Sequence, residues 1–119
     1  MTENIIVDKS KFLALRTIRL YKYLVESKNE FVLSKQLLRC GTSIGANIRE
    51  AVNAMSKKEF LTKMNISLKE AAETEYWLEL LHESEYISEK EFVSIYADCS
   101  EVKAILISII KRANKNTSK

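Results

Sequence analysis

Apolar residues recur at spacings of three and four along most of the chain, which is the period of one face of an α-helix. The clearest series runs from Leu37 through Ile44 to Ala51. Separated by short polar turns, these series predict four helices, over about residues 9–27, 31–55, 57–84 and 89–113. The polar residues 114–119 are expected to form a frayed tail.

Each predicted helix carries one series of residues expected to face a common core. In the first two helices the series are Ala14, Ile18, Tyr21, Leu24 and Val25, then Leu37, Gly41, Ile44, Ile48, Ala51 and Met55. In the last two they are Phe60, Met64, Ser67, Ala71, Thr74, Leu78 and Leu81, then Phe92, Ile95, Cys99, Val102, Leu106, Ile109 and Ile110. Because glycine costs helix stability, Gly41 and Gly45 are expected to allow a neighbouring helix to approach closely.

Signals for helix starts accompany the apolar series. Asp8 is a candidate cap for the first helix, and Ser56 with Glu59 and Ser88 with Glu91 have the spacing of a capping box. Since only a few residues connect the long helices, successive helices must run antiparallel. The sequence therefore predicts an all-α fold, an antiparallel up-down-up-down four-helix bundle, with all 119 residues in a single domain.

The composition supports helices and excludes β-rich folds. The chain has no proline and two glycines, too few for the turns of a sheet, and its 46% apolar content suits a globular domain. No segment reaches the roughly 18 uncharged residues of a membrane span, and no signal peptide is recognisable. Cys40 and Cys99 fit free thiols of a reducing compartment, with a disulfide as the less favoured alternative. We expect a soluble, cytoplasmic protein with no membrane partner.

The net charge of +3 conceals a strong asymmetry along the sequence. Residues 1–58 carry 11 basic and 5 acidic side chains, whereas residues 59–101 carry 3 basic and 11 acidic ones. The segment from Val102 onwards adds 5 basic residues. Such polarity suits either an anionic partner or complementary self-association.

Basic residues of the first helix, together with those near the third helix start and at the chain end, form the candidate nucleic-acid face. These residues are Lys9, Lys11, Arg16, Arg19, Lys22, Lys57, Lys58, Lys111, Arg112 and Lys115. A solvated charged face explains them equally well. Because Tyr23 is the one aromatic residue expected beside them, a sequence-reading RNA module is not expected, and the alternatives are shape-based or phosphate-directed binding.

Two further sets lie away from the predicted core. Ile66, Trp77 and Leu80 form a second apolar stripe on the third helix, which we interpret as contacting either a flanking helix or another subunit. A polar ridge on the second helix and two glutamates of the third form a candidate network, which is either a solvated face or an interfacial hydrogen-bonded cluster. Its residues are Arg39, Ser43, Asn47, Glu50, Glu70 and Glu73.

No catalytic constellation is recognisable. The Glu79-Leu80-Leu81-His82 element has the spacing found in di-iron bundles, but such sites need two elements and this chain has a single histidine. The run from Gly41 to Gly45 lacks the lysine of a phosphate loop. We therefore expect no enzyme activity, no cofactor, no metal site and no small-molecule substrate.

Two runs of residues, Gln36–Ala51 and Leu68–Leu78, resemble the bacterial four-helix-bundle proteins whose founding members are encoded in intervening sequences of 23S ribosomal RNA genes. The similarity extends from about Phe12 to Ile110. The resemblance implies an antiparallel four-helix bundle that assembles into a ring-like homopentamer. One branch of the family, the accessory proteins of diversity-generating retroelements, is basic and works with a reverse transcriptase and its template RNA, which implies an RNA or nucleoprotein partner.

Taken together, these patterns lead to the hypothesis of a non-enzymatic, homo-oligomeric scaffold that binds RNA or a nucleoprotein through its basic face. The alternative is a protein-binding adaptor with no nucleic-acid role.

Overall fold

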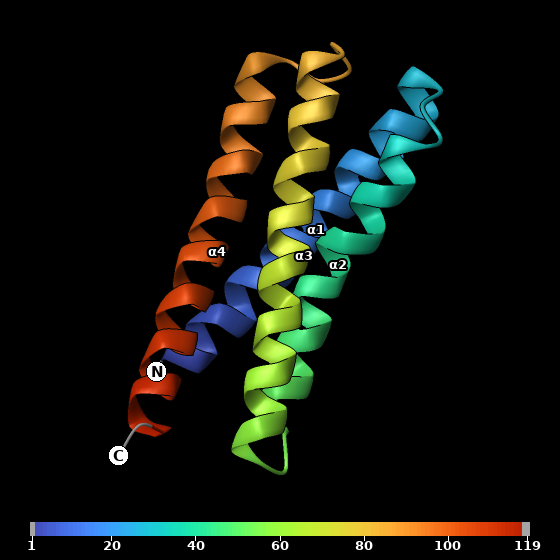
Figure 1. Ribbon diagram of the computed structural model, residues 1–119. Coiled ribbons are helices and arrows are strands. Elements are labelled where there is room, and N and C mark those ends of the chain that lie inside the picture. The colour runs from blue at the N-terminus through green and yellow to red at the C-terminus, as the bar shows by residue number, and fades with distance from the viewer. Residues whose placement is uncertain (1, 118–119) are drawn as a thin grey trace.

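Four long α-helices make up the computed structural model, which describes residues 2–117. In chain order they are α1 (Thr2–Lys28), α2 (Leu33–Val52), α3 (Lys57–Glu83) and α4 (Glu89–Thr117). Each helix runs antiparallel to the next, and α4 returns to pack against α1 (Figure 1). The bundle is elongated, with extents of 52 × 22 × 20 Å. The predicted all-α, antiparallel up-down-up-down four-helix bundle is confirmed.

The helix termini correct several of the predicted boundaries. α1 begins at Thr2 rather than Lys9, so Asp8 lies inside the helix and does not cap it. The early start is stabilised by Ile6, which is completely buried in the core. α4 continues to Thr117, so residues 114–117 are helical rather than frayed, while residues 118 and 119 lie outside the described residues.

The predicted inward stripe of α1 was largely wrong. Of its five members only Leu24 is buried, and the other four are half-buried. The core residues of α1 are instead Ile6, Ser10, Leu13, Thr17, Leu20 and Leu24. Their spacing alternates between four and three, but two of them are polar. Because Ser10 and Thr17 interrupt the hydrophobic series, a search for apolar periodicity did not find it.

Those two polar residues face the two glycines of α2. A Cβ atom on Gly41 would lie 2.6 Å from Cγ2 of Thr17, and one on Gly45 would lie 3.3 Å from Oγ of Ser10. The buried hydroxyls are satisfied within α1, where Thr17 donates to the carbonyl of Ala14 at 2.8 Å. The glycines therefore let α1 and α2 approach closely, as their spacing predicted.

Residues 29–32 join α1 to α2, and Asn29 and Glu30 shape this turn. Asn29 takes a left-handed conformation with φ of 54°, and the amide of Glu30 then bonds to the carbonyl of Leu24 at 2.9 Å. The Glu30 carboxylate accepts hydrogen bonds from the amides of Val32, Leu33 and Ser34 at 3.2, 2.9 and 2.6 Å. These bonds satisfy the first free amides of α2.

α2 is shorter than predicted, because it spans Leu33–Val52 rather than 31–55. Met55 was expected in the core but is 93% exposed in the turn before α3. The serine half of the following capping box forms as predicted, since Oγ of Ser56 accepts from the amide of Glu59 at 3.1 Å, but the Glu59 side chain bonds one residue earlier than the expected serine amide. The Glu59 carboxylate accepts in turn from the amide of Met55 at 3.1 Å.

Buried polar contacts fix α3 between its two neighbours. Ser67 donates to the carbonyl of Ile44 on α2 at 2.8 Å. On the other side, the buried carboxylate of Glu75 accepts from Lys103 at 2.7 Å and from Ser100 at 2.8 Å, both on α4. Directional bonds of this kind set the register of packed helices. None of the described helices combines the length and apolar character of a bilayer-spanning segment.

Candidate nucleic-acid interface

In α3 and in α4, most of the basic residues and most of the acidic residues lie in opposite halves of the helix. In α3 the lysines precede all the acidic residues except Glu59, and in α4 the acidic residues precede all the basic ones except Lys90. Because the two helices are antiparallel, their basic halves come to the same end of the bundle, where the α2–α3 turn and both chain termini lie (Figure 1). We call this region the basic end, and its six exposed cations are Lys57, Lys58, Lys69, Lys111, Arg112 and Lys115.

The cations of the basic end are not neutralised by any carboxylate that the structure describes. Among the described side chains, no acidic oxygen lies within ion-pair distance of any of the six. Lys63, by contrast, pairs with Glu50 at 2.6 Å, and this hydrogen bond raises the pKa of Lys63. Within the described part of the chain, the positive charge of the basic end is therefore left for a partner or for solvent.

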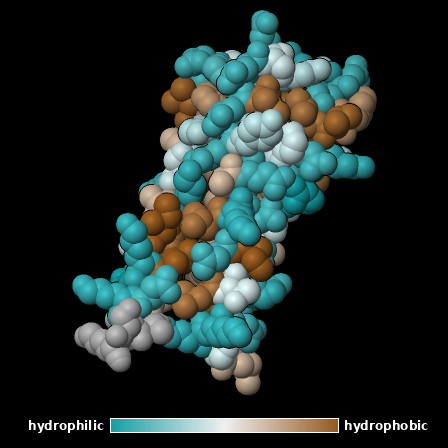
Figure 2. Space-filling view, in the orientation of Figure 1, coloured by the Kyte–Doolittle hydropathy of each residue, from teal (hydrophilic) through white to brown (hydrophobic). Residues whose placement is uncertain are grey.

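A shallow hollow of about 590 Å³ lies along the first half of α3. Three lysines surround its apolar floor, and it is lined by Lys57, Lys58, Leu61, Thr62, Asn65, Ile66 and Lys69. Figure 2 shows hydrophobic side chains reaching the surface over the lower halves of α3 and α4. Lys69 was missing from the predicted set, although its position eleven residues after Lys58 places both on one helix face.

The basic residues of α1 fall into two groups. Lys9 pairs with Glu101 at 3.2 Å, and Arg16 pairs with Asp98 at 2.7 Å and with Glu91 at 3.3 Å. These bonds join α1 to α4, so both cations act within the fold. The predicted residues Lys11, Arg19 and Lys22 are exposed and have no ion-pair partner among the described side chains.

The predicted polar network divides into three separate contacts. Arg39 of α2 pairs with Glu70 at 3.4 Å and also with Glu73 of α3. Asn47 donates to Oγ of Ser43 within α2 at 3.0 Å. The remaining member, Glu50, instead pairs with Lys63, which was not among the predicted residues. The structure thus brings together Arg39, Glu70 and Glu73, pairs Ser43 with Asn47, and leaves Glu50 apart from both groups.

The predicted apolar stripe on α3 is only partly accessible. Trp77 and Leu80 are half-buried, and Trp77 packs against the core while its indole nitrogen donates to Glu73 at 3.0 Å. Ile66 is the most exposed of the three, at 36%. Packing against the core and a hydrogen bond within α3 therefore account for part of this stripe.

A second exposed apolar set was missed by the sequence analysis. Ile5, Phe12 and Leu15 are exposed on one side of α1, at spacings of seven and three. Phe12 is 54% exposed. The heptad spacing was a detectable signal, but the misplaced core stripe of α1 obscured it. We call these three residues the α1 stripe.

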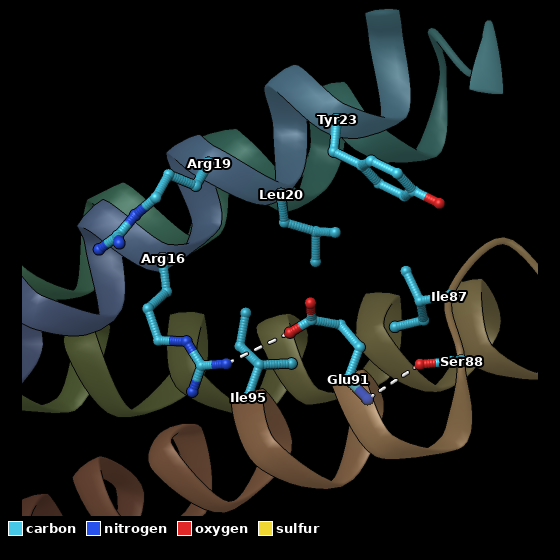
Figure 3. Close-up of a pocket in the computed structure, with 8 residues that line it drawn as sticks. All are labelled: Arg16, Arg19, Leu20, Tyr23, Ile87, Ser88, Glu91 and Ile95. Atoms are coloured by element: carbon cyan, nitrogen blue, oxygen red, sulfur yellow. Dashed lines mark hydrogen bonds and ion pairs between the residues drawn. The ribbon is translucent and has the colours of Figure 1, made fainter. Parts of the chain in front are cut away.

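Near the α3–α4 turn, α1 and α4 border a cleft of about 510 Å³ (Figure 3). The α1 wall presents Arg16, Arg19, Leu20 and Tyr23, and the other wall presents Ile87, Ser88, Glu91 and Ile95. Figure 3 shows the Glu91 carboxylate between the two helices, bonded to Arg16. This cleft combines buried apolar residues with charged groups at its rim.

The single histidine and the two cysteines make contacts that stabilise the fold. His82 pairs with Glu89 at 2.8 Å and stacks on Phe92 with ring centroids 4.3 Å apart. Burial raises the pKa of Cys40 to about 11 and that of Cys99 to about 12, which disfavours the reactive thiolates. Across the described residues, no three His, Cys, Asp or Glu side chains gather as a metal site would require.

Comparisons with known proteins agree with this architecture. The model of a family described as 23S rRNA-intervening sequence protein matches residues 2–108. A crystal structure of a protein of unknown function from the S23 ribosomal protein family of Bacteroides thetaiotaomicron is 57% identical, with a TM-score of 0.92. The similarity covers 93% of this chain and 99% of that chain. None of the curated proteins matches this chain.

Proposed function

Since this chain belongs to the family of 23S rRNA-intervening sequence proteins, we propose that it is a non-enzymatic, homo-oligomeric scaffold of the cytoplasm that binds RNA or a nucleoprotein. The basic end is the observation that carries this proposal. Six exposed cations, which no carboxylate described in the structure neutralises, gather there from two helices that each carry an acidic half elsewhere. The two free, buried thiols suit a reducing compartment.

Binding at the basic end would be directed to phosphates. Each lysine or arginine that neutralises a phosphate releases a condensed counterion, so affinity falls steeply as salt rises. The hollow on α3 adds apolar surface between its lysines, which suits the sugar and base portions of an unpaired strand. Arg16 and Lys9 contribute little, because α4 carboxylates already hold them.

Reversing two charges at the basic end is expected to weaken nucleic-acid binding. The variant Lys57→Glu, Lys58→Glu should bind a labelled hairpin RNA about tenfold or more weakly than the wild type. On duplex DNA, the slope of log affinity against log salt should fall by about 0.9 per lost phosphate contact. Binding is measured by fluorescence anisotropy across a salt series, with duplex DNA alongside.

The matched control is Lys35→Glu, Lys90→Glu. These exposed lysines also lie in first turns of helices, so the two variants share the same charge change and the same helix-dipole effect. Equal losses of nucleic-acid affinity in the two variants would show that net charge, not the basic end, governs binding. Absence of wild-type binding at low salt would overturn the nucleic-acid proposal in favour of the protein-binding adaptor.

Self-association is expected to use the exposed apolar surface. We propose a homopentamer, as the family resemblance implies, and light scattering should then give several times the monomer mass of 13.7 kDa. Phe12→Glu should reduce that mass, because a charge in the α1 stripe would be buried without a partner. Phe31→Glu is the control, since Phe31 is similarly exposed at 56% but lies in the α1–α2 turn. A monomeric wild type at micromolar concentration would refute self-association.

A further inference from the structure

The α1–α4 cleft is a slot between two helices that is large enough for a nucleobase. Its volume of about 510 Å³ lies within the range of small-molecule sites. Leu20, Ile87 and Ile95 are buried and line its floor, while the ring of Tyr23, 44% exposed, stands at the rim. Aromatic and aliphatic side chains arranged in this way accept the faces of nucleobases.

A carboxylate with a defined position projects into the slot. One oxygen of Glu91 accepts from Arg16 at 3.3 Å, and Arg16 is itself held by Asp98 at 2.7 Å and Ser94 at 3.0 Å. The other oxygen of Glu91 has no hydrogen-bond partner among the described residues. Figure 3 shows this carboxylate in the middle of the cleft, facing Leu20. A ligand with adjacent N–H donors would complete its hydrogen bonding.

Arg19 supplies an available cation at the rim. Its guanidinium forms no ion pair with the described side chains, in contrast to that of Arg16. Arg19 lies toward the Arg16 side of the cleft and Tyr23 toward the other (Figure 3). A phosphate attached to the ligand would pair with it.

We propose that this cleft binds the guanine base of an unpaired nucleotide. The guanine N1–H and N2–H groups are adjacent donors that match a carboxylate, whereas adenine presents an acceptor at N1 that would face Glu91. The ring lies over the apolar floor beside Tyr23, and the phosphate contacts Arg19. The base has two candidate sources, an RNA strand and a free guanine nucleotide. The inference rests on the proposed function only for the RNA strand.

The experiment is calorimetric titration of the full-length protein with GMP and with AMP. GMP should bind at least about tenfold more tightly than AMP, as expected for one good paired base contact. Glu91→Gln should abolish this preference, whereas Glu83→Gln, an exposed carboxylate of α3 outside the cleft, should retain it. Equal affinities for GMP and AMP, or equal behaviour of the two variants, would overturn the proposal.

Misfolding would not explain a loss of the preference for GMP in the Glu91→Gln variant. The cap at the start of α4 uses the amide of Glu91, which donates to Oγ of Ser88 at 3.1 Å, and not its side chain. Arg16 also retains Asp98. Circular dichroism should therefore show unchanged helicity. Arg19→Ala should weaken GMP binding but leave guanosine binding unchanged, which separates the phosphate contact from the base contact.

The source of the base is identified with single-stranded oligonucleotides that carry one guanine or one adenine in a uridine tract. A preference for the guanine oligonucleotide that is lost in Glu91→Gln supports an RNA strand as ligand. A preference seen with free GMP alone supports a free nucleotide. Because the basic end lies at the other end of the bundle, the Lys57→Glu, Lys58→Glu variant should keep the GMP response even where RNA binding fails, so the two proposals fail separately.

Discussion

Gly41→Ala is expected to lower the free energy of unfolding by about 1–3 kcal/mol, the usual cost of overpacking a core. Alanine is the better helix former by about 1 kcal/mol, so propensity alone predicts the opposite sign. The added Cβ would lie 2.6 Å from Cγ2 and 2.9 Å from Oγ1 of Thr17, which is completely buried. Because the Cβ of Thr17 would also lie only 3.0 Å away, rotating that side chain does not relieve the clash, and α1 and α2 must move apart at this point.

The matched control for this change is Gly45→Ala. There a Cβ would lie 3.3 Å from Oγ of Ser10, a small side chain that needs to shift only slightly. We expect a neutral or stabilising effect of up to about 1 kcal/mol, set by helix propensity. Urea unfolding followed by circular dichroism measures both variants. A stabilised Gly41→Ala would show that the two helices are not held at this separation.

Glu30→Ala is expected to destabilise the protein by about 1–3 kcal/mol, because it leaves the first amides of α2 without acceptors. Glu30 is only 7% exposed, so water replaces the lost carboxylate poorly. Glu26→Ala is the control, since Glu26 is exposed on α1 and forms no hydrogen bond with the described residues. A similar stability for the two variants would contradict the capping role of Glu30.

The same residue predicts how stability depends on pH. Burial raises the pKa of Glu30, but hydrogen bonds from the amides of Leu33, Ser34 and Val32 outweigh burial and lower the pKa below its usual value. A depressed pKa in the folded state means that the ionised carboxylate stabilises the fold above the unfolded pKa, about 4.3, and that this contribution is lost as pH falls through the folded value. The stability difference between wild type and Glu30→Ala should therefore be constant near neutral pH and shrink in acid.

Local signals predicted the start of α3 and the core faces of the last three helices well. The Ser56 and Ser88 caps act within four residues, and they form with the expected hydrogen bonds. α1 was less predictable. Its core positions include Ser10 and Thr17, whose hydroxyls bond to their own helix, so polarity in the sequence did not mean exposure in the fold.

The candidate site was predictable only in part, because charge in the sequence does not reveal pairing. Arg16 and Arg19 look alike in sequence, yet Asp98 and Glu91 of α4 hold the first, whereas no described carboxylate pairs with the second. Lys69 lines the hollow on α3. The α1–α4 cleft is lined by two groups of residues that lie about seventy positions apart in the sequence. Contacts at such separations depend on how helices pack.

By itself the sequence determined that this protein is a four-helix bundle, because hydrophobic periodicity, capping residues and short connections are local and act within each helix or turn. The tertiary structure alone decided which charges are neutralised and where the others gather. Antiparallel packing placed the basic half of α3 beside the basic half of α4, although the sequence separates them with an acidic segment. Electrostatic fields depend on distance in space, so the basic end exists only once the helices have packed.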